Sequence, residues 1–231
     1  MCFDFDQTLA YIERGHLALY VQAAAEHGVA VTQEALAAQP LGDVWAPWMT
    51  PLGPDHRAAS ADEGAFRALR EGLHVARLRG AGVDADEGTL AGVARRIADL
   101  EGEPDHYRLF DDALPALERL ARAGVPAVIV SNHVWRLPEI VVGLGCGARV
   151  EGVLTSARVG VRKPHPEIFR AALRLTGTAP GETLMVGDSL RDDVEGARGV
   201  GMQGALIDRR GRAGAPEGTA LLRSLLEVPL A

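Results

Sequence analysis

The sequence is poor in several features, and each scarcity excludes a class of protein. Its two cysteines, Cys2 and Cys146, provide neither a disulfide framework nor the spacing of a metal site. No apolar run approaches the ~20 residues that cross a bilayer, and the N-terminus lacks the pattern of a secretion signal. With 24 basic against 31 acidic residues, the net charge is −7, and no basic footprint predicts nucleic-acid binding. We therefore expect a cytoplasmic protein, monomeric or homodimeric, that binds neither nucleic acid nor membrane.

Lysine is the scarcest charged residue, because Lys163 is the only lysine among the 24 basic side chains. Arginine is a broad planar fork, whereas lysine is a compact point charge on a thin stem. A lysine kept in so arginine-rich a chain indicates either a narrow anionic pocket or an ordinary surface residue. The lysine alone does not decide between them.

What the sequence does contain is enough apolar material, 47% of residues, for a substantial core. Beyond residue 107, strands alternate with helices, which predicts a mostly parallel, Rossmann-like α/β sheet with helices on both faces. The expected strands are 126–130, 152–155, 183–186 and 204–207, and the expected helices are 112–123, 134–144, 166–176 and 190–198. We expect this α/β core to combine residues 1–13 and 108–231.

The segment between the two parts of the core, residues 14–107, is predicted to be an inserted small domain made of helices. Alanine- and leucine-rich stretches predict helices at 15–27, 61–79 and 86–100. Between the first two of these, residues 39–56 combine proline, glycine and tryptophan, which is typical of an irregular loop.

The first candidate functional group lies just after a short N-terminal strand, in the run Asp4-x-Asp6-x-Thr8. Two residues apart on a strand, both carboxylates leave the same face. One can attack as a nucleophile while the other moves a proton, if their environments differ. The same pattern also occurs in turns rich in capping residues, so it does not decide the function alone.

Three further groups follow strand ends or loops, where open α/β sheets place their ligands. Ser131-Asn132 can donate hydrogen bonds to a phosphoryl oxygen or cap the next helix. Lys163 is the second group. The third contains Asp188 and Asp193, whose carboxylates suit Mg²⁺ but can also serve the following helix as caps.

Taken in this order, the four groups resemble the four-motif signature of the haloacid dehalogenase-like superfamily. The run from Val186 to Arg198 is especially similar, and the insertion 14–107 resembles the small helical cap of that family's first cap type. The resemblance implies a Mg²⁺-dependent phosphomonoester hydrolase that acts on a small phosphorylated metabolite. Asp4 would be the nucleophile that forms an aspartyl-phosphate, and Asp6 the acid and then the base.

The resemblance also implies how the remaining groups act. Lys163 would neutralise the nucleophile and the phosphoryl oxygens. The implied phosphate-binding residues are Thr8, Ser131, Asn132 and Lys163. The implied Mg²⁺ ligands are Asp4, Asp6 through its backbone carbonyl, Asp188 and Asp193.

Within the family, Asp6 favours phosphoryl transfer over 2-haloacid dehalogenation, because halide leaves without a proton and the family's dehalogenases lack this aspartate. Phosphonoacetaldehyde cleavage needs a cap lysine, and residues 14–107 contain none. A phosphomutase and a catalytically idle binding protein stay open as alternatives, and the identity of the ester is not predicted.

The sequence departs from the family pattern in two ways. Gln7 stands where a glycine is usual, and only three residues precede Asp4, where the family has a longer apolar strand. The first strand is therefore expected to be short, or the start of the chain assigned too late. Leaving-group contacts are expected from the cap and from the second motif. Candidates for substrate specificity are Arg14, His16, Trp45, Trp48 and His133, although the two tryptophans also fit a role in packing the helical domain.

Overall fold

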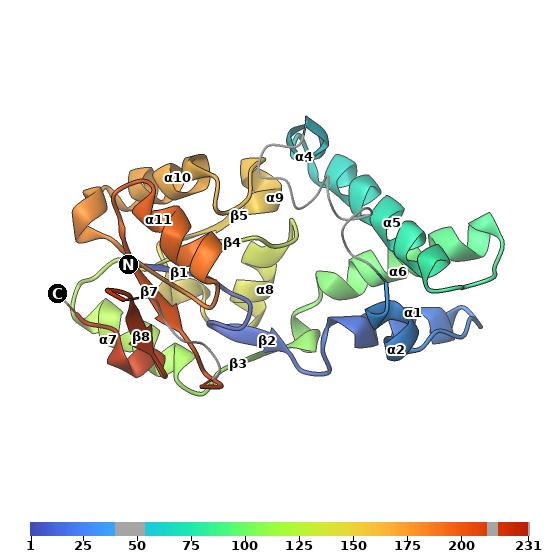
Figure 1. The fold of residues 1–231 in the computed structure, drawn as a ribbon, viewed down its shortest axis with the longest axis horizontal. Helices are drawn as coiled ribbons and strands as arrows, with labels where there is room; N and C mark the ends of the chain where they lie inside the picture. The colour runs from blue at the N-terminus through green and yellow to red at the C-terminus, as the bar shows by residue number, and fades with distance from the viewer. Residues whose placement is uncertain (40–53, 212–216, 231) are drawn as a thin grey trace.

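The fold, in a computed structural model, is built on a six-stranded sheet (Figure 1), and the structure describes residues 1–39, 54–211 and 217–230. The strand order is β5-β4-β1-β6-β7-β8, and every neighbouring pair is parallel. The strands are β1 Cys2–Phe3, β4 Val128–Ser131, β5 Gly152–Thr155, β6 Leu184–Gly187, β7 Gln203–Ile207 and β8 Ala220–Leu222. The expected parallel α/β sheet is confirmed, and β8 is a strand that the sequence did not predict.

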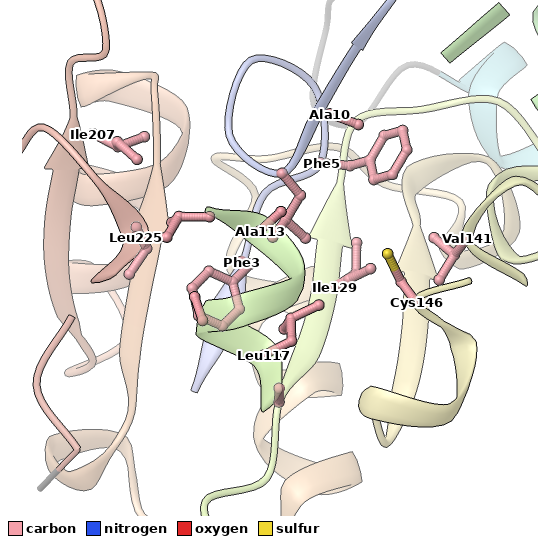
Figure 2. Close-up of a cluster of buried hydrophobic side chains, with 14 of the residues drawn as sticks. Phe3, Phe5, Ala10, Ala113, Leu117, Ile129, Val141, Cys146, Ile207 and Leu225 are labelled. Carbon is pink, nitrogen blue, oxygen red and sulfur yellow. The ribbon is translucent and has the colours of Figure 1, made fainter. Parts of the chain in front are cut away.

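One face of the sheet packs against α7 (Ala113–Arg122) and α8 (Leu137–Gly143). Phe3 and Ile129 point toward Leu117 of α7 in the apolar cluster of Figure 2. Because side chains alternate along a strand, the neighbouring residues belong to the opposite face. These strands are buried on both faces, which is why they are apolar throughout rather than alternating with polar residues.

The other face carries a second apolar cluster. It joins Cys2 and Val128 to Phe169 of α10 (Pro166–Thr176) and Ala197 of α11 (Gly196–Arg198). Helices therefore cover both faces of the sheet, as the alternation of strands and helices predicts.

The N-terminal strand β1 is short, as expected, but it lies at the centre of the sheet. It pairs with β4 on one side and β6 on the other. The Met1 ammonium donates to the Pro126 carbonyl at 2.8 Å, and the Asp4 N–H donates to Val186 O at 2.9 Å. Hydrogen bonds on both sides thus hold the short strand that ends next to Asp4.

The segment between the two parts of the core is helical and lies to one side of the sheet (Figure 1). It contains α1 His16–Glu26, α2 Gln33–Ala37, α4 Pro54–Ala59, α5 Glu63–Gly80 and α6 Glu87–Glu101. Asp62 and Asp86 cap α5 and α6, each accepting a backbone N–H three residues on, at 2.8 and 3.0 Å. Leu19, Leu78 and Ile97 belong to an apolar cluster of the segment's own.

The three helices expected in this segment are confirmed, with ends shifted by a few residues. The expected loop 39–56 is wrong at its end, because α4 begins at Pro54, in the first turn where proline is well tolerated. Residues 40–53, including Trp45 and Trp48, lie outside the described residues.

Two short strands connect the helical segment to the sheet. β2 (Ala10–Ile12) and β3 (Tyr107–Leu109) form an antiparallel ribbon in which Ile12 faces Tyr107. The sequence did not predict this ribbon. Both chain crossings therefore run side by side, next to the domain boundaries expected at 13/14 and 107/108.

The remaining elements are short. They are α9 Ser156–Val159, η1 Pro104–His106, η2 Gly147–Arg149, η3 Pro180–Glu182, η4 Leu190–Glu195 and η5 Leu225–Glu227. The helix expected at 190–198 is instead the π-helical η4 followed by α11, and the helix expected at 134–144 begins only at Leu137. None of the helices among the described residues is both long and apolar enough to span a membrane.

Candidate active site

The candidate site lies where the central strands β4, β1 and β6 end, side by side, at one edge of the sheet. Asp4 directly follows β1, Ser131 is the last residue of β4, and Asp188 directly follows β6. Because these strands are parallel neighbours, their carboxyl ends meet at the same edge. Segments far apart in the sequence thus place their polar residues together.

Lys163 joins two of the acidic groups at this edge. Its Nζ lies 2.7 Å from Asp4 Oδ1 and 2.6 Å from Asp193 Oδ1, and the residue is only 3% exposed. Burial opposes the charge, but the Asp193 and Asp4 carboxylates outweigh it and raise the pKa of Lys163. The single lysine of the chain is thus a buried ammonium in a pocket of carboxylates, and the ordinary-surface interpretation is wrong.

Asp193 reaches this pocket because Gly187 leaves room for it. A Cβ on Gly187 would lie 2.1 Å from Asp193 Oδ2, so no other residue fits without moving the carboxylate. The Ser189 N–H donates to the same oxygen at 3.0 Å, while the other oxygen contacts Lys163. Burial, partly offset by the charge of Lys163, raises the pKa of Asp193.

Three carboxylates at this edge form a group that can hold a metal ion. Asp4, Asp188 and Asp193 each offer an oxygen, and these oxygens lie within 4.8 Å of one another. Opposite ligands of Mg²⁺ stand about 4.2 Å apart, since each Mg–O bond is about 2.1 Å. Asp188 is exposed, yet partial loss of hydration, and then the charge of Asp4, raise its pKa to about 6. The donor set is made of hard oxygens and fits the ion with little rearrangement.

Asp6 is placed differently from Asp4, although only one residue separates them. Its side chain is 45% exposed and lines a cavity of about 150 Å³ together with Tyr107 and Asn132. Although part of the side chain is exposed, loss of hydration in this cavity, followed by the charge of Asp4, raises the pKa of Asp6 to about 7. An acid with this pKa can hold or release a proton near neutrality.

The turn after Asp6 contains the departure from the family pattern. Gln7 has φ = 58°, the left-handed conformation that glycine adopts at least cost. The N–H groups of Thr8, Leu9 and Ala10 all donate to Phe5 O, at 2.9 to 3.3 Å. The tight turn is therefore kept without the glycine.

The residues expected to bind phosphate have different surroundings. Ser131 is 2% exposed at the end of β4. Thr8 is buried, and its Oγ1 finds no hydrogen-bond partner among the described residues. Asn132 Nδ2 donates to Lys163 O at 3.0 Å, and its Oδ1 accepts from Lys163 N at 2.8 Å. Asn132 thus holds the backbone of Lys163, and its contact with phosphate stays a prediction.

Of the residues expected to set specificity, His16 and His133 line the cavity beside Asp6. Arg14 does not line this cavity; it is exposed and lines another hollow with Asp105 and Arg108. The structure therefore brings two of the expected specificity residues to the candidate acid. The two tryptophans lie outside the described residues.

Sequence reasoning missed Arg70 and Glu101, which also line the cavity. Glu101 is 2% exposed and accepts from Arg70 Nε at 3.2 Å, and its other oxygen lies 2.7 Å from His16 Nε2. In the chain, Glu101 lies 31 residues from Arg70 and 85 residues from His16, so no local sequence pattern indicates these contacts.

Comparisons with known proteins agree with this arrangement. A sequence model of haloacid dehalogenase-like hydrolases matches residues 1–201. The phosphoserine phosphatase of Thermus thermophilus is 36% identical over 202 residues, covering 86% of this chain and 76% of that protein. The glyceraldehyde 3-phosphate phosphatase of Pyrococcus furiosus is 37% identical over 99 residues, 42% of this chain and 41% of that protein.

Solved structures share the fold across nearly the whole chain. A HAD-hydrolase of Bacillus subtilis bound to magnesium has a TM-score of 0.69 at 23% identity, covering 98% of this chain and 94% of that one. The family match spans both parts of the core as well as the helical segment between them. The chain therefore belongs to the haloacid dehalogenase-like hydrolases, and within them it is a phosphatase-like enzyme.

Proposed function

We propose that the protein is a Mg²⁺-dependent phosphomonoester hydrolase that works through an aspartyl-phosphate on Asp4. The observation that carries the proposal is the contact of the Lys163 ammonium with Asp4 at 2.7 Å, next to the carboxylates of Asp188 and Asp193. A nucleophile, a fixed cation and a metal-binding group thus meet at one edge of the sheet. That combination suits the transfer of a phosphoryl group.

In the first step, an Asp4 carboxylate oxygen attacks phosphorus and the bond to the leaving oxygen breaks. Lys163 faces Asp4 and offsets the charge that gathers on the phosphoryl oxygens. Asp6, protonated, gives its proton to the leaving oxygen, and the alcohol departs. The raised pKa of Asp6, about 7, suits an acid that must carry a proton near neutrality.

In the second step, water attacks the phosphorus of the aspartyl-phosphate. Asp6, now a carboxylate, takes a proton from this water, and the bond between the Asp4 oxygen and phosphorus breaks. Inorganic phosphate leaves, and both aspartates return to their starting forms. One carboxylate therefore serves as nucleophile and the other as acid and base, because Asp4 is buried against Lys163 while Asp6 faces the cavity.

A divalent cation would offset the excess negative charge at this site. The carboxylates of Asp4, Asp188 and Asp193 gather around one ammonium, and a phosphate ester would add further negative charge. Asp4, Asp188 and Asp193 would hold Mg²⁺, together with the Asp6 carbonyl that the family resemblance implies. When bound, the ion neutralises charge and polarises the phosphoryl group.

We further propose that residues 14–107 form a cap that covers the site. The antiparallel ribbon of β2 and β3 gathers both crossings into one narrow connection. Phe66 and Leu73 of α5 pack with Ala157 of the core, so the segment also touches the core away from the ribbon. A cavity of about 150 Å³ between them limits the leaving group to a small metabolite.

The test is a panel of phosphate esters, including p-nitrophenyl phosphate, O-phosphoserine and sugar phosphates, assayed with Mg²⁺ and with EDTA. We expect release of inorganic phosphate with Mg²⁺ and a loss of at least about 100-fold in EDTA. Isomerised sugar phosphate without free phosphate would instead indicate a mutase. A folded protein that turns over none of the esters would contradict the proposal and favour a binding protein.

A further inference from the structure

His133 occupies an unusual position beside the candidate acid. It follows the Ser131-Asn132 pair at the end of β4, and its Nε2 lies 3.5 Å from Asp6 Oδ2. The residue is 6% exposed, whereas the Asp6 side chain is 45% exposed. A buried ring thus faces a carboxylate that has room to move.

The imidazole ring of His133 is held on several sides. Phe5 packs edge-on against it, with ring centroids 5.3 Å apart and planes at 89°, and the Tyr107 ring lies 5.7 Å away. The Thr155 hydroxyl contacts the backbone carbonyls of His133 and Val134 at 2.7 and 2.9 Å. Phe5 and Tyr107 thus restrain the ring, and Thr155 restrains the backbone that carries it, as a positioning group requires.

Asp6, by contrast, has little else to orient it. Within the described part of the chain, its carboxylate makes no other ion pair and no side-chain hydrogen bond. Separations of 3.5 Å are long for a hydrogen bond, but such contacts tighten when substrate binds. His133 is the group best placed to fix the direction in which the Asp6 carboxyl points.

We propose that His133 is a positioning residue that holds Asp6 so that its acidic proton points at the leaving oxygen of the ester. This inference rests on the proposed function. The contact uses Oδ2 of Asp6, which leaves Oδ1 to carry the proton. In the first step that proton passes to the leaving alkoxide as the phosphorus–oxygen bond breaks, and Asp6 is left as a carboxylate hydrogen-bonded to His133.

The proposal predicts an effect that depends on the leaving group. An alkoxide is a strong base and needs the proton, whereas p-nitrophenolate is a weak base that departs without one. Phenolate lies between them, since phenols such as tyrosine have a pKa of about 10. Loss of His133 is therefore expected to slow alkyl esters most, phenyl phosphate less and p-nitrophenyl phosphate least. A purely structural role would slow all three by the same factor.

The experiment compares His133→Phe with wild type on p-nitrophenyl phosphate, phenyl phosphate and an alkyl ester. The alkyl ester is whichever of O-phosphoserine and glycerol 3-phosphate the wild type hydrolyses faster. Phenylalanine keeps the ring and its packing but removes both nitrogens. His133→Gln is the second variant, because its amide can return a donor near the Nε2 position. Ile140→Val, in the same apolar cluster as Phe5 and Tyr107, is the control for altered packing.

We expect His133→Phe to lower kcat/KM, which reports the step in which the alcohol leaves, by about tenfold more on the alkyl ester than on p-nitrophenyl phosphate, as general-acid catalysis contributes ~10²–10⁴-fold. His133→Gln should recover part of the difference, and Ile140→Val should show none. Equal losses of kcat/KM on all three esters, in either His133 variant, would overturn the positioning role while leaving the hydrolase proposal intact. A wild-type protein that hydrolyses none of the esters would overturn both.

Discussion

Two buried ionic clusters in this molecule are built in opposite ways. At the edge of the sheet, the ammonium of Lys163 lies against Asp4 and Asp193, with Asp188 close by. In the helical segment, Glu101 contacts several basic side chains, namely Arg70, His16 and His74. The first cluster has an excess of carboxylates and the second has an excess of donors.

The pKa values follow this difference. Partial loss of hydration raises the pKa of the exposed Asp188 to about 6, and the charge of Asp4 adds to it. Burial acts in the same direction on Glu101, but the charge of Arg70 and the hydrogen bonds from His16 and His74 outweigh it, and the pKa of Glu101 falls well below its usual range. Burial also lowers the pKa of His74 to about 4, so it is neutral at pH 7. The Lys163 cluster calls for a further cation, whereas the Glu101 cluster is complete without one.

The largest expected effect comes from the nucleophile. Asp4→Asn removes the attacking carboxylate but keeps its shape, so we expect hydrolysis to fall by ~10³-fold or more. Steady-state phosphate release measures the loss, and circular dichroism checks the fold. Asp86→Asn, the same change at an exposed helix cap, is the control. Activity near wild type in the Asp4 variant would show that another group is the nucleophile.

The next effect tests the narrowness of the lysine pocket. Lys163→Arg keeps the charge, but a planar fork does not fit where Nζ lies 2.7 and 2.6 Å from two carboxylates in a buried site. We expect kcat to fall by ~10²-fold, comparable with the loss of one transition-state donor. Lys163→Met, which removes the charge, should be at least as impaired. A fully active arginine variant would mean that any cation suffices.

The free energy of unfolding should distinguish the buried Glu101 cluster from exposed ion pairs. Glu101→Gln removes the buried carboxylate charge that faces Arg70, and we expect a loss of about 3–5 kcal/mol in the free energy of unfolding. Glu103→Gln breaks the partly exposed pair with Arg96, and we expect a loss of about 1 kcal/mol or less. Urea denaturation measures both changes. Equal losses would mean that burial does not distinguish the two pairs.

The smallest effect is a pH dependence of metal binding. Asp188 has a raised pKa of about 6, so below this pH it is protonated and neutral. Mg²⁺ must then displace a proton, and its apparent affinity falls by up to about tenfold per pH unit. Thermal shift with and without MgCl₂, at pH 7.5 and pH 5.5, should show the larger stabilisation at pH 7.5. Comparing the melting temperature with and without MgCl₂ at the same pH removes any contribution from histidine titration to the stability of the protein. In the Asp188→Asn variant, most of the stabilisation by MgCl₂ should be lost.

How much the sequence predicts differs between the two clusters for a physical reason. Asp4, Asp188 and Ser131 each follow an apolar strand directly, and parallel strands end at one edge of a sheet, so their meeting follows from local patterns. Lys163 stands out through composition. Glu101 gives no such signal, because its partners lie on other helices and a buried charge looks like a surface charge in sequence.

The sequence also left some features unpredicted where a short local pattern fits more than one structure. The sequence predicts a cap or a phosphate contact for Asn132, and the structure adds that its amide holds the backbone of Lys163, 31 residues away. The ribbon of β2 and β3 has three residues in each strand, too few to show a period. The π-helical turn at Leu190–Glu195 resembles an ordinary helix in sequence.

The central claim is that phosphate passes through a covalent bond to Asp4. It can be tested by quenching the wild-type enzyme during turnover of p-nitrophenyl phosphate with Mg²⁺, reducing any acyl phosphate with borohydride, and analysing the peptides by mass spectrometry. We predict that the Asp4 side chain is converted to homoserine during turnover and unchanged without substrate. Turnover in which Asp4 stays unmodified, or in which Asp6 is the residue converted to homoserine, would contradict the account.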